Sequence, residues 1–270
     1  MPPPLAMNRI PVLLTAFLFL VSLSTLQAET PPFPAGIDHR PWDRLLKTYV
    51  DERGLVDYAG WHANAGDRAA LDRYIAQFAP ASKTPATGDD AIASLINAYN
   101  AITIAWILDN YPTPSIRKTD DPWDVERWQL GGERVSLDDI EHVFLRPEIS
   151  WAVHSVVVCA ARSCPPLRRE AFTANNWYAL MEDSYRRWLA RDDLNRFLPE
   201  KNTVRLSKIF DWYEEDFTGE HTIPAVLRRY APERYEAFLK GDFKIRFLDY
   251  HWGLNAQSDL GKDYDHGWFF

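Results

Sequence analysis

The chain has 270 residues, of which 46% are hydrophobic, 25% charged and 14% aromatic, and its formal net charge is -8. This composition is typical of a globular protein, and an acidic chain without a long Lys/Arg run is a poor candidate for binding nucleic acid or an anionic membrane. With 2 cysteines and 12 glycines, the sequence lacks a multi-disulfide scaffold, a four-cysteine zinc site and a glycine-rich nucleotide loop.

The first 28 residues have the three parts of a secretory signal peptide. Arg9 supplies positive charge, residues 12–23 are apolar, and Ala28 offers a small residue for cleavage. The apolar stretch is shorter than the about 20 residues that a membrane-spanning helix needs, so a cleaved signal is favoured over an uncleaved anchor. The sequence therefore predicts an exported protein, periplasmic or extracellular, with no stable membrane span after cleavage.

Helical patterns dominate the first half of the mature chain. Apolar residues at helical spacing predict helices at 42–50 and 67–78. A third predicted helix runs from about 89 to 110 and is apolar on most sides, so we expect it to be central. The predicted organisation is a signal peptide at 1–28, a lead-in with its helix at 29–54, a main domain at 55–255 and a tail at 256–270.

Turn and capping signals come next along the chain. Residues 128–135 predict a β-hairpin that turns at Gly131 and Gly132. Ser136 and Asp139 fit a capping box at the start of a helix, and we expect Pro147 to break the chain after that helix.

A strand pattern follows this helix. Residues 153–159 are rich in β-branched side chains and apolar on both faces, which predicts a buried central strand. The remaining predicted elements are helices at 174–189, 223–230 and 232–239, a helix that Ser207 can cap, and strands at 203–206 and 243–250. The mixture predicts an α+β fold, a helix-rich single domain packed around a small central β-sheet.

The polar loop after the predicted strand carries Cys164. A cysteine nucleophile needs a base or a cationic neighbour, and His154, His142 and Arg162 are the candidates. Such neighbours would lower the thiol pKa below the usual value of about 8.5. In an exported chain, Cys159 and Cys164 could instead form a disulfide, because four intervening residues can bring their Cα atoms within about 7 Å. These interpretations remain open at the level of the sequence.

Polar residues on two predicted helices have equally open roles. His142 lies four residues from Asp138 and from Arg146, so one helix face could orient its imidazole through a carboxylate or be a solvated charged ladder. Asn97 and Asn100 lie three apart in the long apolar helix. Their amides could tie the helix to neighbouring backbone or form the floor of a polar site.

Five ordered motifs resemble the domain-of-unknown-function family numbered 547. They are residues 95–101, 140–146, 154–165, 206–217 and 250–255, so the resemblance spans most of the mature chain. The last motif of the family usually has Asp where this chain has His251, so that position is not expected to supply a catalytic carboxylate. The family has no established activity to carry over, but in some members the domain is joined to a glutaredoxin-like module, which favours thiol chemistry.

We therefore expect one polar pocket that gathers the candidate residues. The expected catalytic groups are Cys164, His154 and His142, and the expected binding groups are Asn97, Asn100, Glu141 and Arg162. One hypothesis is a thiol-dependent hydrolase or acyltransferase in which Cys164 attacks and a histidine is the base. The other is a non-catalytic binding or interaction module with a structural or redox disulfide. The ligand would be an unknown small molecule or peptide, and neither a metal site nor a cofactor is predicted.

Overall fold

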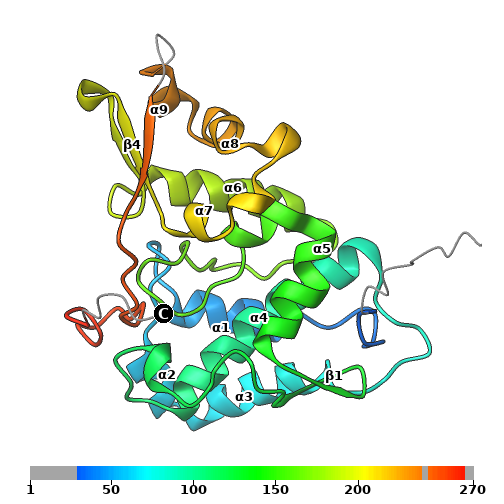
Figure 1. The fold of residues 1–270 in the computed structure, drawn as a ribbon. Coiled ribbons are helices and arrows are strands. Elements are labelled where there is room, and N and C mark those ends of the chain that lie inside the picture. The colour runs from blue at the N-terminus through cyan, green and yellow to red at the C-terminus, as the bar shows by residue number, and fades with distance from the viewer. Residues whose placement is uncertain (1–28, 239–242, 265–270) are drawn as a thin grey trace, which may run out of the picture.

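A long buried helix, α4 (Gly88–Asp109), forms the centre of the fold in the computed structural model, which describes residues 29–238 and 243–264 (Figure 1). The predicted signal peptide at 1–28 and the end of the predicted tail lie outside these residues. Of the 22 residues of α4, 15 are buried, which confirms the expected central helix. By length and hydropathy α4 could cross a membrane, but 83% of its most apolar window is buried inside the protein, as in any core helix.

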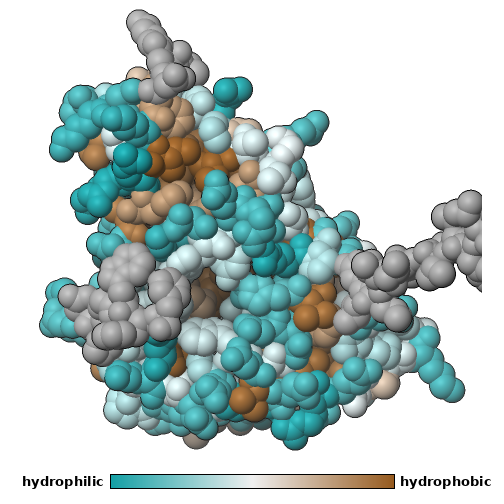
Figure 2. All heavy atoms as spheres, in the orientation of Figure 1, coloured by the Kyte–Doolittle hydropathy of each residue, from teal (hydrophilic) through white to brown (hydrophobic). Residues whose placement is uncertain are grey.

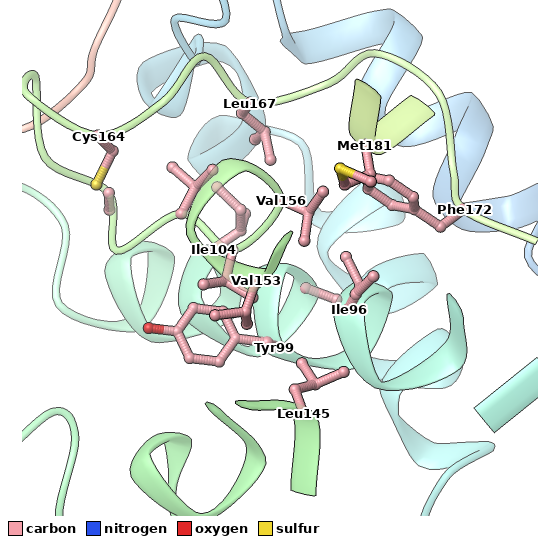
Figure 3. Packing of buried hydrophobic residues seen from close by; sticks show 14 of the residues in the cluster. Ile96, Tyr99, Ile104, Leu145, Val153, Val156, Cys164, Leu167, Phe172 and Met181 are labelled. Carbon is pink, nitrogen blue, oxygen red and sulfur yellow. The ribbon is translucent and has the colours of Figure 1, made fainter. Parts of the chain in front are cut away.

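Side chains from distant segments pack against α4 (Figure 3). Ile96 and Tyr99 of the helix belong to one cluster with Val153, Val156 and Met181, and each of the five is at most 2% exposed. Burying an aliphatic side chain of this size contributes about 1.5–3 kcal/mol. This packing therefore fixes the segment around residue 155 against the helix.

The helices α2 (Tyr58–Ala63) and α3 (Ala65–Ala76) pack against α4, and α1 (Arg40–Tyr49) packs against both of them. The predicted helices at 42–50 and 67–78 are thus confirmed as α1 and α3, each beginning two residues earlier. Aromatic rings join these helices, because Trp42 stacks on Tyr74 at 5.8 Å and Tyr49 stacks on Trp61 at 4.6 Å between ring centroids. Such pairs add stability beyond the area they bury.

The predicted hairpin is present as β1 (Trp128–Leu130) and β2 (Glu133–Val135), after the short helix η1 (Ile116–Lys118). Its turn residues Gly131 and Gly132 both have positive φ, 58° and 88°. Two consecutive positive φ angles are what the favoured two-residue hairpin turn requires, and glycine adopts them without steric cost.

The next helix begins as predicted but does not end at Pro147. The Asp139 N–H donates to Ser136 Oγ at 3.0 Å and the Ser136 N–H donates to Asp139 Oδ2 at 2.8 Å, which confirms the capping box. The helix then widens into a π-helix, η2 (Asp139–Leu145), and continues as α5 (Arg146–Ile149). Proline lacks an N–H and its ring clashes with the carbonyl four residues earlier, and a wider turn relieves that clash.

The predicted central strand at 153–159 is wrong. Its first part is a 3₁₀-helix, η3 (Ser150–Ser155), and the rest is irregular backbone. The side chain of Asn100 replaces a strand partner, because its Nδ2 donates to Val156 O at 2.8 Å and its Oδ1 accepts from the Val158 N–H at 2.9 Å. The β-branched residues of this segment therefore indicate that it is buried, and not that it forms a strand.

The remaining elements form the upper part of the molecule in Figure 1. They are α6 (Trp177–Ala190), β3 (Arg196–Leu198), η4 (Pro199–Lys201), β4 (Thr203–Leu206), α7 (Ile209–Trp212), η5 (Glu214–Asp216), η6 (Gly219–His221), α8 (Ile223–Tyr230), α9 (Pro232–Glu236) and β5 (Lys244–Phe247). In their sheet, β4 pairs antiparallel with β3 and parallel with β5. The α+β fold class is confirmed for the described residues, with the three-stranded sheet beside α9 and the long helix at the centre.

A buried histidine joins α1, α3 and α4. His39 is 8% exposed, its Nδ1 lies 2.8 Å from Tyr74 Oη, and its Nε2 lies 3.3 Å from Ser94 Oγ. Burial lowers the pKa of His39, and the nearby charges of Asp90 and Asp38 oppose this shift only in part. The folded protein therefore favours the neutral imidazole.

This histidine should make the protein less stable in mild acid. A folded pKa below the unfolded value means that stability is complete above about pH 6.5 and is lost as the pH falls below it. Urea unfolding of wild type and His39→Gln at about pH 7.5 and about pH 5.5 should show a smaller acid loss in the variant. His62→Gln, at an exposed ring, is the control and should keep the wild-type loss. Equal losses in all three proteins would contradict the prediction.

Candidate functional site

A cavity of about 190 Å³ lies where α4, η2, α7 and the C-terminal segment meet. Its lining residues are Tyr99, Trp123, Asp138, Glu141, His142, His154, Val157, Cys159, Cys164, Ile209, Trp212, Tyr213, Tyr250 and Trp252. Figure 2 shows that this face of the molecule is hollowed near its middle, with an apolar floor. The cavity gathers Cys164, His154, His142 and Glu141, four of the residues that the sequence proposed for one pocket.

Two thiols face each other in the cavity wall. Cys159 Sγ and Cys164 Sγ are 2.7 Å apart, and both cysteines are free. The Tyr250 hydroxyl touches both, at 3.1 Å from Cys164 Sγ and 3.4 Å from Cys159 Sγ. Cys164 is 4% exposed and lies at the edge of the core (Figure 3), and Cys159 is partly exposed.

The C-terminal segment 250–255 holds the cysteine loop in place. The Arg162 N–H donates to Gly253 O at 2.7 Å, and the His251 N–H donates to Ser163 Oγ at 2.8 Å. The backbone of Ala160 takes a positive φ of 59° beside this pairing. Residues 160–163 and 251–255 thus run alongside each other, and this contact brings Tyr250 to the two sulfurs.

The two thiols differ in acidity. The hydrogen bond to Cys164, together with burial, raises the pKa of Cys159 well above its usual value. Burial by itself would raise the pKa of Cys164, but hydrogen bonds from the Cys159 thiol and the Tyr250 hydroxyl outweigh it and lower that pKa. Cys164 is therefore the thiol that ionises first, because its thiolate keeps these hydrogen bonds.

The lowered pKa of Cys164 agrees in direction with the sequence prediction, but its cause is different. The guanidinium of Arg162 points away and donates to Ala256 O at 3.3 Å and Ser258 O at 3.0 Å. Within the described ranges, no hydrogen bond joins the Cys164 sulfur to the imidazole of His154 or His142. Neutral donors, rather than cations, stabilise the thiolate.

His154 is oriented by an ionised carboxylate. Its Nε2 lies 2.7 Å from Asp216 Oδ2, and its ring stacks on Tyr213 at 4.2 Å between centroids. Arg146 Nε donates to the same carboxylate oxygen at 2.6 Å. Burial would raise the pKa of Asp216, but the hydrogen bonds from His154 and Arg146 outweigh it and lower the pKa to about 2. The carboxylate and the stacked ring together fix the orientation of the imidazole.

His142 has a looser carboxylate neighbour. Its Nε2 lies 3.9 Å from Asp138 Oδ1, four residues earlier as predicted, whereas Arg146 turns to Asp216 and does not continue the ladder. Burial and a hydrogen bond with Asp124 raise the pKa of Asp138 to about 6. The buried Nδ1 of His142 has no hydrogen-bond partner in the part of the chain that the structure describes.

Glu141 is a buried carboxylate in the cavity wall. It is 8% exposed, and no Lys or Arg of the described ranges forms an ion pair with it. Its neighbour is Tyr99, whose pKa is raised well above the usual value by burial and further by the Glu141 carboxylate. Carboxylates are rarely buried without a cationic partner, so this one is unusual.

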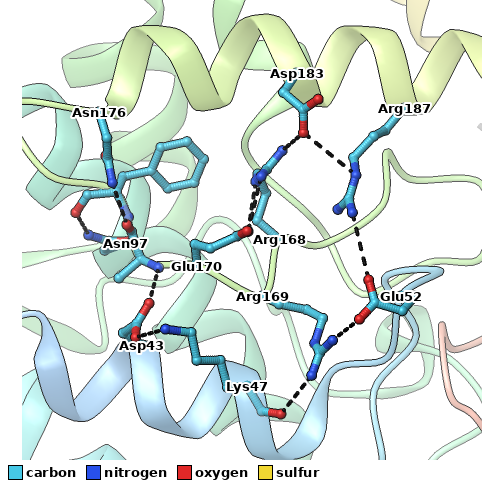
Figure 4. A network of polar contacts seen from close by, with 12 residues as sticks. Asp43, Lys47, Glu52, Asn97, Arg168, Arg169, Glu170, Asn176, Asp183 and Arg187 are labelled. Carbon is cyan, nitrogen blue, oxygen red and sulfur yellow. Dashed lines mark hydrogen bonds and ion pairs between the residues drawn. The ribbon is translucent and has the colours of Figure 1, made fainter.

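The other expected binding residues do not line the cavity. The amide of Asn97 forms two hydrogen bonds with the backbone of Phe172: its Nδ2 donates to Phe172 O at 2.7 Å, and its Oδ1 accepts from the Phe172 N–H at 3.0 Å. Asn97 belongs to the network of polar contacts in Figure 4. Asn100 holds the backbone of Val156 and Val158. Both amides therefore tie α4 to neighbouring segments, which was the structural alternative.

Sequence reasoning did not assign Tyr250 and Asp216 to the site. Tyr250 was interpreted as core or rim packing, and only the resemblance of its motif drew attention to Asp216, which orients His154 without lining the cavity. His251 closes its own turn, because its Nδ1 accepts from the Gly253 N–H at 3.0 Å and its Nε2 lies 2.9 Å from Lys262 O. Its departure from the family pattern thus falls on a structural position.

Fold and cavity together define a helix-rich α+β protein with a paired-thiol cavity. Residues 84–189 match the family model described as "Protein of unknown function, DUF547", which confirms the resemblance for this part of the chain. The matched range includes both cysteines and both cavity histidines, whereas the motifs at 206–217 and 250–255 lie beyond it. No curated protein and no solved structure matches the chain. Among residues 29–238 and 243–264, no group of three or more His, Cys, Asp or Glu could hold a metal ion.

Proposed function

We propose that Cys159 and Cys164 form a redox-active dithiol that exchanges with a disulfide substrate in the cavity. The observation that carries this proposal is the 2.7 Å separation of two free sulfurs that share one hydroxyl neighbour in a cavity wall. Their unequal acidity supports a division of labour, since exchange needs one thiolate to attack and a second thiol to resolve the intermediate.

The reaction balances without another reagent. The Cys164 thiolate attacks one sulfur of the substrate disulfide, the substrate S–S bond breaks, and its second sulfur leaves as a thiolate with the electron pair. Cys159 then loses its proton and attacks Cys164 Sγ, which releases the first substrate sulfur and leaves the protein disulfide. Two electrons pass to the substrate, and the two released thiolates take up the protons.

Single-cysteine variants test this order of events. With hydroxyethyl disulfide as the substrate, reduced Cys159→Ser should accumulate a mixed disulfide on Cys164, whereas wild type should lose two hydrogens and retain no adduct by mass spectrometry. Cys164→Ser should react much more slowly, because it retains only the less acidic thiol. In glutathione buffers the wild-type pair should titrate reversibly above about -300 mV. A lower potential would identify a structural disulfide and favour a non-catalytic binding module, and unreactive thiols would refute the proposal.

A second candidate is acyl transfer by a thiol-dependent hydrolase or acyltransferase. The observation in its favour is the His154–Asp216 pair in the same cavity as Cys164, since a carboxylate-oriented imidazole can serve as a general base. A screen of activated esters separates the candidates. Cys159→Ser should keep acyl transfer and lose dithiol exchange, whereas Cys164→Ser should lose both.

We propose also that the protein is exported, because residues 1–28 carry a charged start, an apolar stretch and a small residue for cleavage. Mass spectrometry of the secreted or periplasmic product should show a chain that begins near Glu29. An intact leader would contradict this proposal.

A further inference from the structure

Much of the cavity wall is aromatic, and its rings come from four separate parts of the chain. Six of its lining residues carry phenol or indole rings: Tyr99, Trp123, Trp212, Tyr213, Tyr250 and Trp252. The rings meet at steep angles, 67° between Trp123 and Trp252 and 55° between Tyr250 and Trp252, with centroids 5.8 Å and 4.6 Å apart. Trp212 also stacks on Trp252 at 26°, so these rings form one aromatic wall along a partly open cavity. The faces of such rings attract ammonium groups.

The cavity is lined by carboxylates without a matching Lys or Arg among the described residues. Glu141 and Asp138 line it, and no Lys or Arg does so among the described residues. Arg117 and Arg146 stack on Trp252 and Tyr213, with 5.1 Å and 5.0 Å from Cζ to the ring centroid, but neither arginine lines the cavity. The buried Glu141 carboxylate thus faces a space that contains no positive group to pair with it, other than a protonated histidine.

We propose that this cavity binds an alkylammonium cation, with Glu141 as the counter-charge and the indole rings of Trp123 and Trp212 against the alkyl groups. Aromatic faces attract cations, and a buried carboxylate gains most from a partner that enters without much bound water. The cavity of about 190 Å³ is below the about 300 Å³ at which drug-sized pockets begin, so it suits a small cationic group rather than a whole peptide. The substrate class for the dithiol would be a small disulfide that carries an ammonium group, and this part rests on the proposed function.

Binding of the cation can be tested without the thiols. In the double variant Cys159→Ser/Cys164→Ser, choline should bind at about pH 8 at least about tenfold more tightly than its uncharged isostere dimethylbutanol, by calorimetry or Trp fluorescence. Glu141→Gln should weaken choline binding by about tenfold, and Trp212→Phe should weaken it several-fold. Glu148→Gln makes the same change of charge on the exposed side of the adjoining helix and should bind choline as before. Equal binding of choline and the isostere, or no loss in Glu141→Gln, would overturn the site.

The choice of substrate is tested with three disulfides that differ in charge. Reduced wild type should exchange fastest with cystamine, more slowly with neutral hydroxyethyl disulfide and slowest with anionic dithiodipropionate, after each rate is divided by that of free mercaptoethanol. Glu141→Gln should reduce the preference for cystamine. If choline binds and no disulfide reacts, the proposal of a redox-active dithiol is refuted and the proposal of a cation site is supported. If all three disulfides react at equal normalised rates and choline does not bind, the proposal of a redox-active dithiol is supported and the proposal of a cation site is refuted.

Discussion

Replacing Asn100 with alanine should lower the free energy of unfolding by about 3–5 kcal/mol. The amide of Asn100 is 3% exposed and bonds the carbonyl of Val156 and the N–H of Val158, so its removal leaves two buried backbone groups without partners. Each such group costs about 1–3 kcal/mol, and the small cavity left behind adds to the loss. Urea unfolding monitored by Trp fluorescence measures the change.

Asn110→Ala is the matched control on the same helix. Its Nδ2 donates to Trp106 O at 2.8 Å near the end of α4, where the side chain is only partly buried. The free energy of unfolding of Asn110→Ala should fall by less than about 1 kcal/mol. Amide hydrogen exchange gives a second measurement, since the Val158 N–H should lose protection in Asn100→Ala alone. Similar losses in the two variants would show that the backbone around Val156 does not depend on this amide.

Gly54→Ala should destabilise the protein by about 3–5 kcal/mol, much more than Gly36→Ala. Both glycines have positive φ, 78° and 70°, so both substitutions carry the same conformational strain of about 1–2 kcal/mol. A Cβ at Gly54 would lie 2.6 Å from Leu167 N and 2.6 Å from Pro166 Cα, whereas a Cβ at Gly36 would meet nothing within 4 Å. The difference between the variants therefore isolates the clash with the loop that follows Cys164.

The clash in Gly54→Ala should also change the reactivity of Cys164. Pro166 lies two residues after Cys164, so the shift that relieves the contact moves the cysteine loop and should slow alkylation of Cys164 in folded Gly54→Ala. Gly36→Ala should keep the wild-type rate. Equal free energies of unfolding for Gly54→Ala and Gly36→Ala would contradict the prediction, because the loop after Cys164 would then move away from the new Cβ without cost.

Local patterns predicted the elements whose own residues decide their structure. The hairpin needed two glycines, the capping box needed Ser136 and Asp139, and α4 needed a long apolar stretch. The segment 153–159 was misread because its backbone partner is a side chain from residue 100, which periodicity in the segment cannot indicate. Pro147 was misread for a related reason, since the preceding turn of helix widened to accommodate it.

The candidate site was predictable in its residue types and not in its geometry. Cys164, His154, His142 and Glu141 do line one cavity, but the interpretation of Arg162 as a cation beside the thiol did not anticipate that its guanidinium binds the tail. Tyr250 could not have been paired with the thiols from spacing, because 91 and 86 positions separate it from Cys159 and Cys164. Contacts over such separations depend on the whole path of the chain.

That separation also sets when the chemistry of the thiols begins. A chain that grows from its N-terminus contains both cysteines long before Tyr250, and until the segment 250–255 folds back, the thiols lack the hydroxyl that contacts both sulfurs and the backbone pairing that holds their loop. In this interval neither thiol has the hydrogen bond with Tyr250 that lowers its pKa in the folded protein. A chain truncated before residue 250 would therefore keep both sulfur atoms and lose the hydroxyl that favours the thiolate of Cys164.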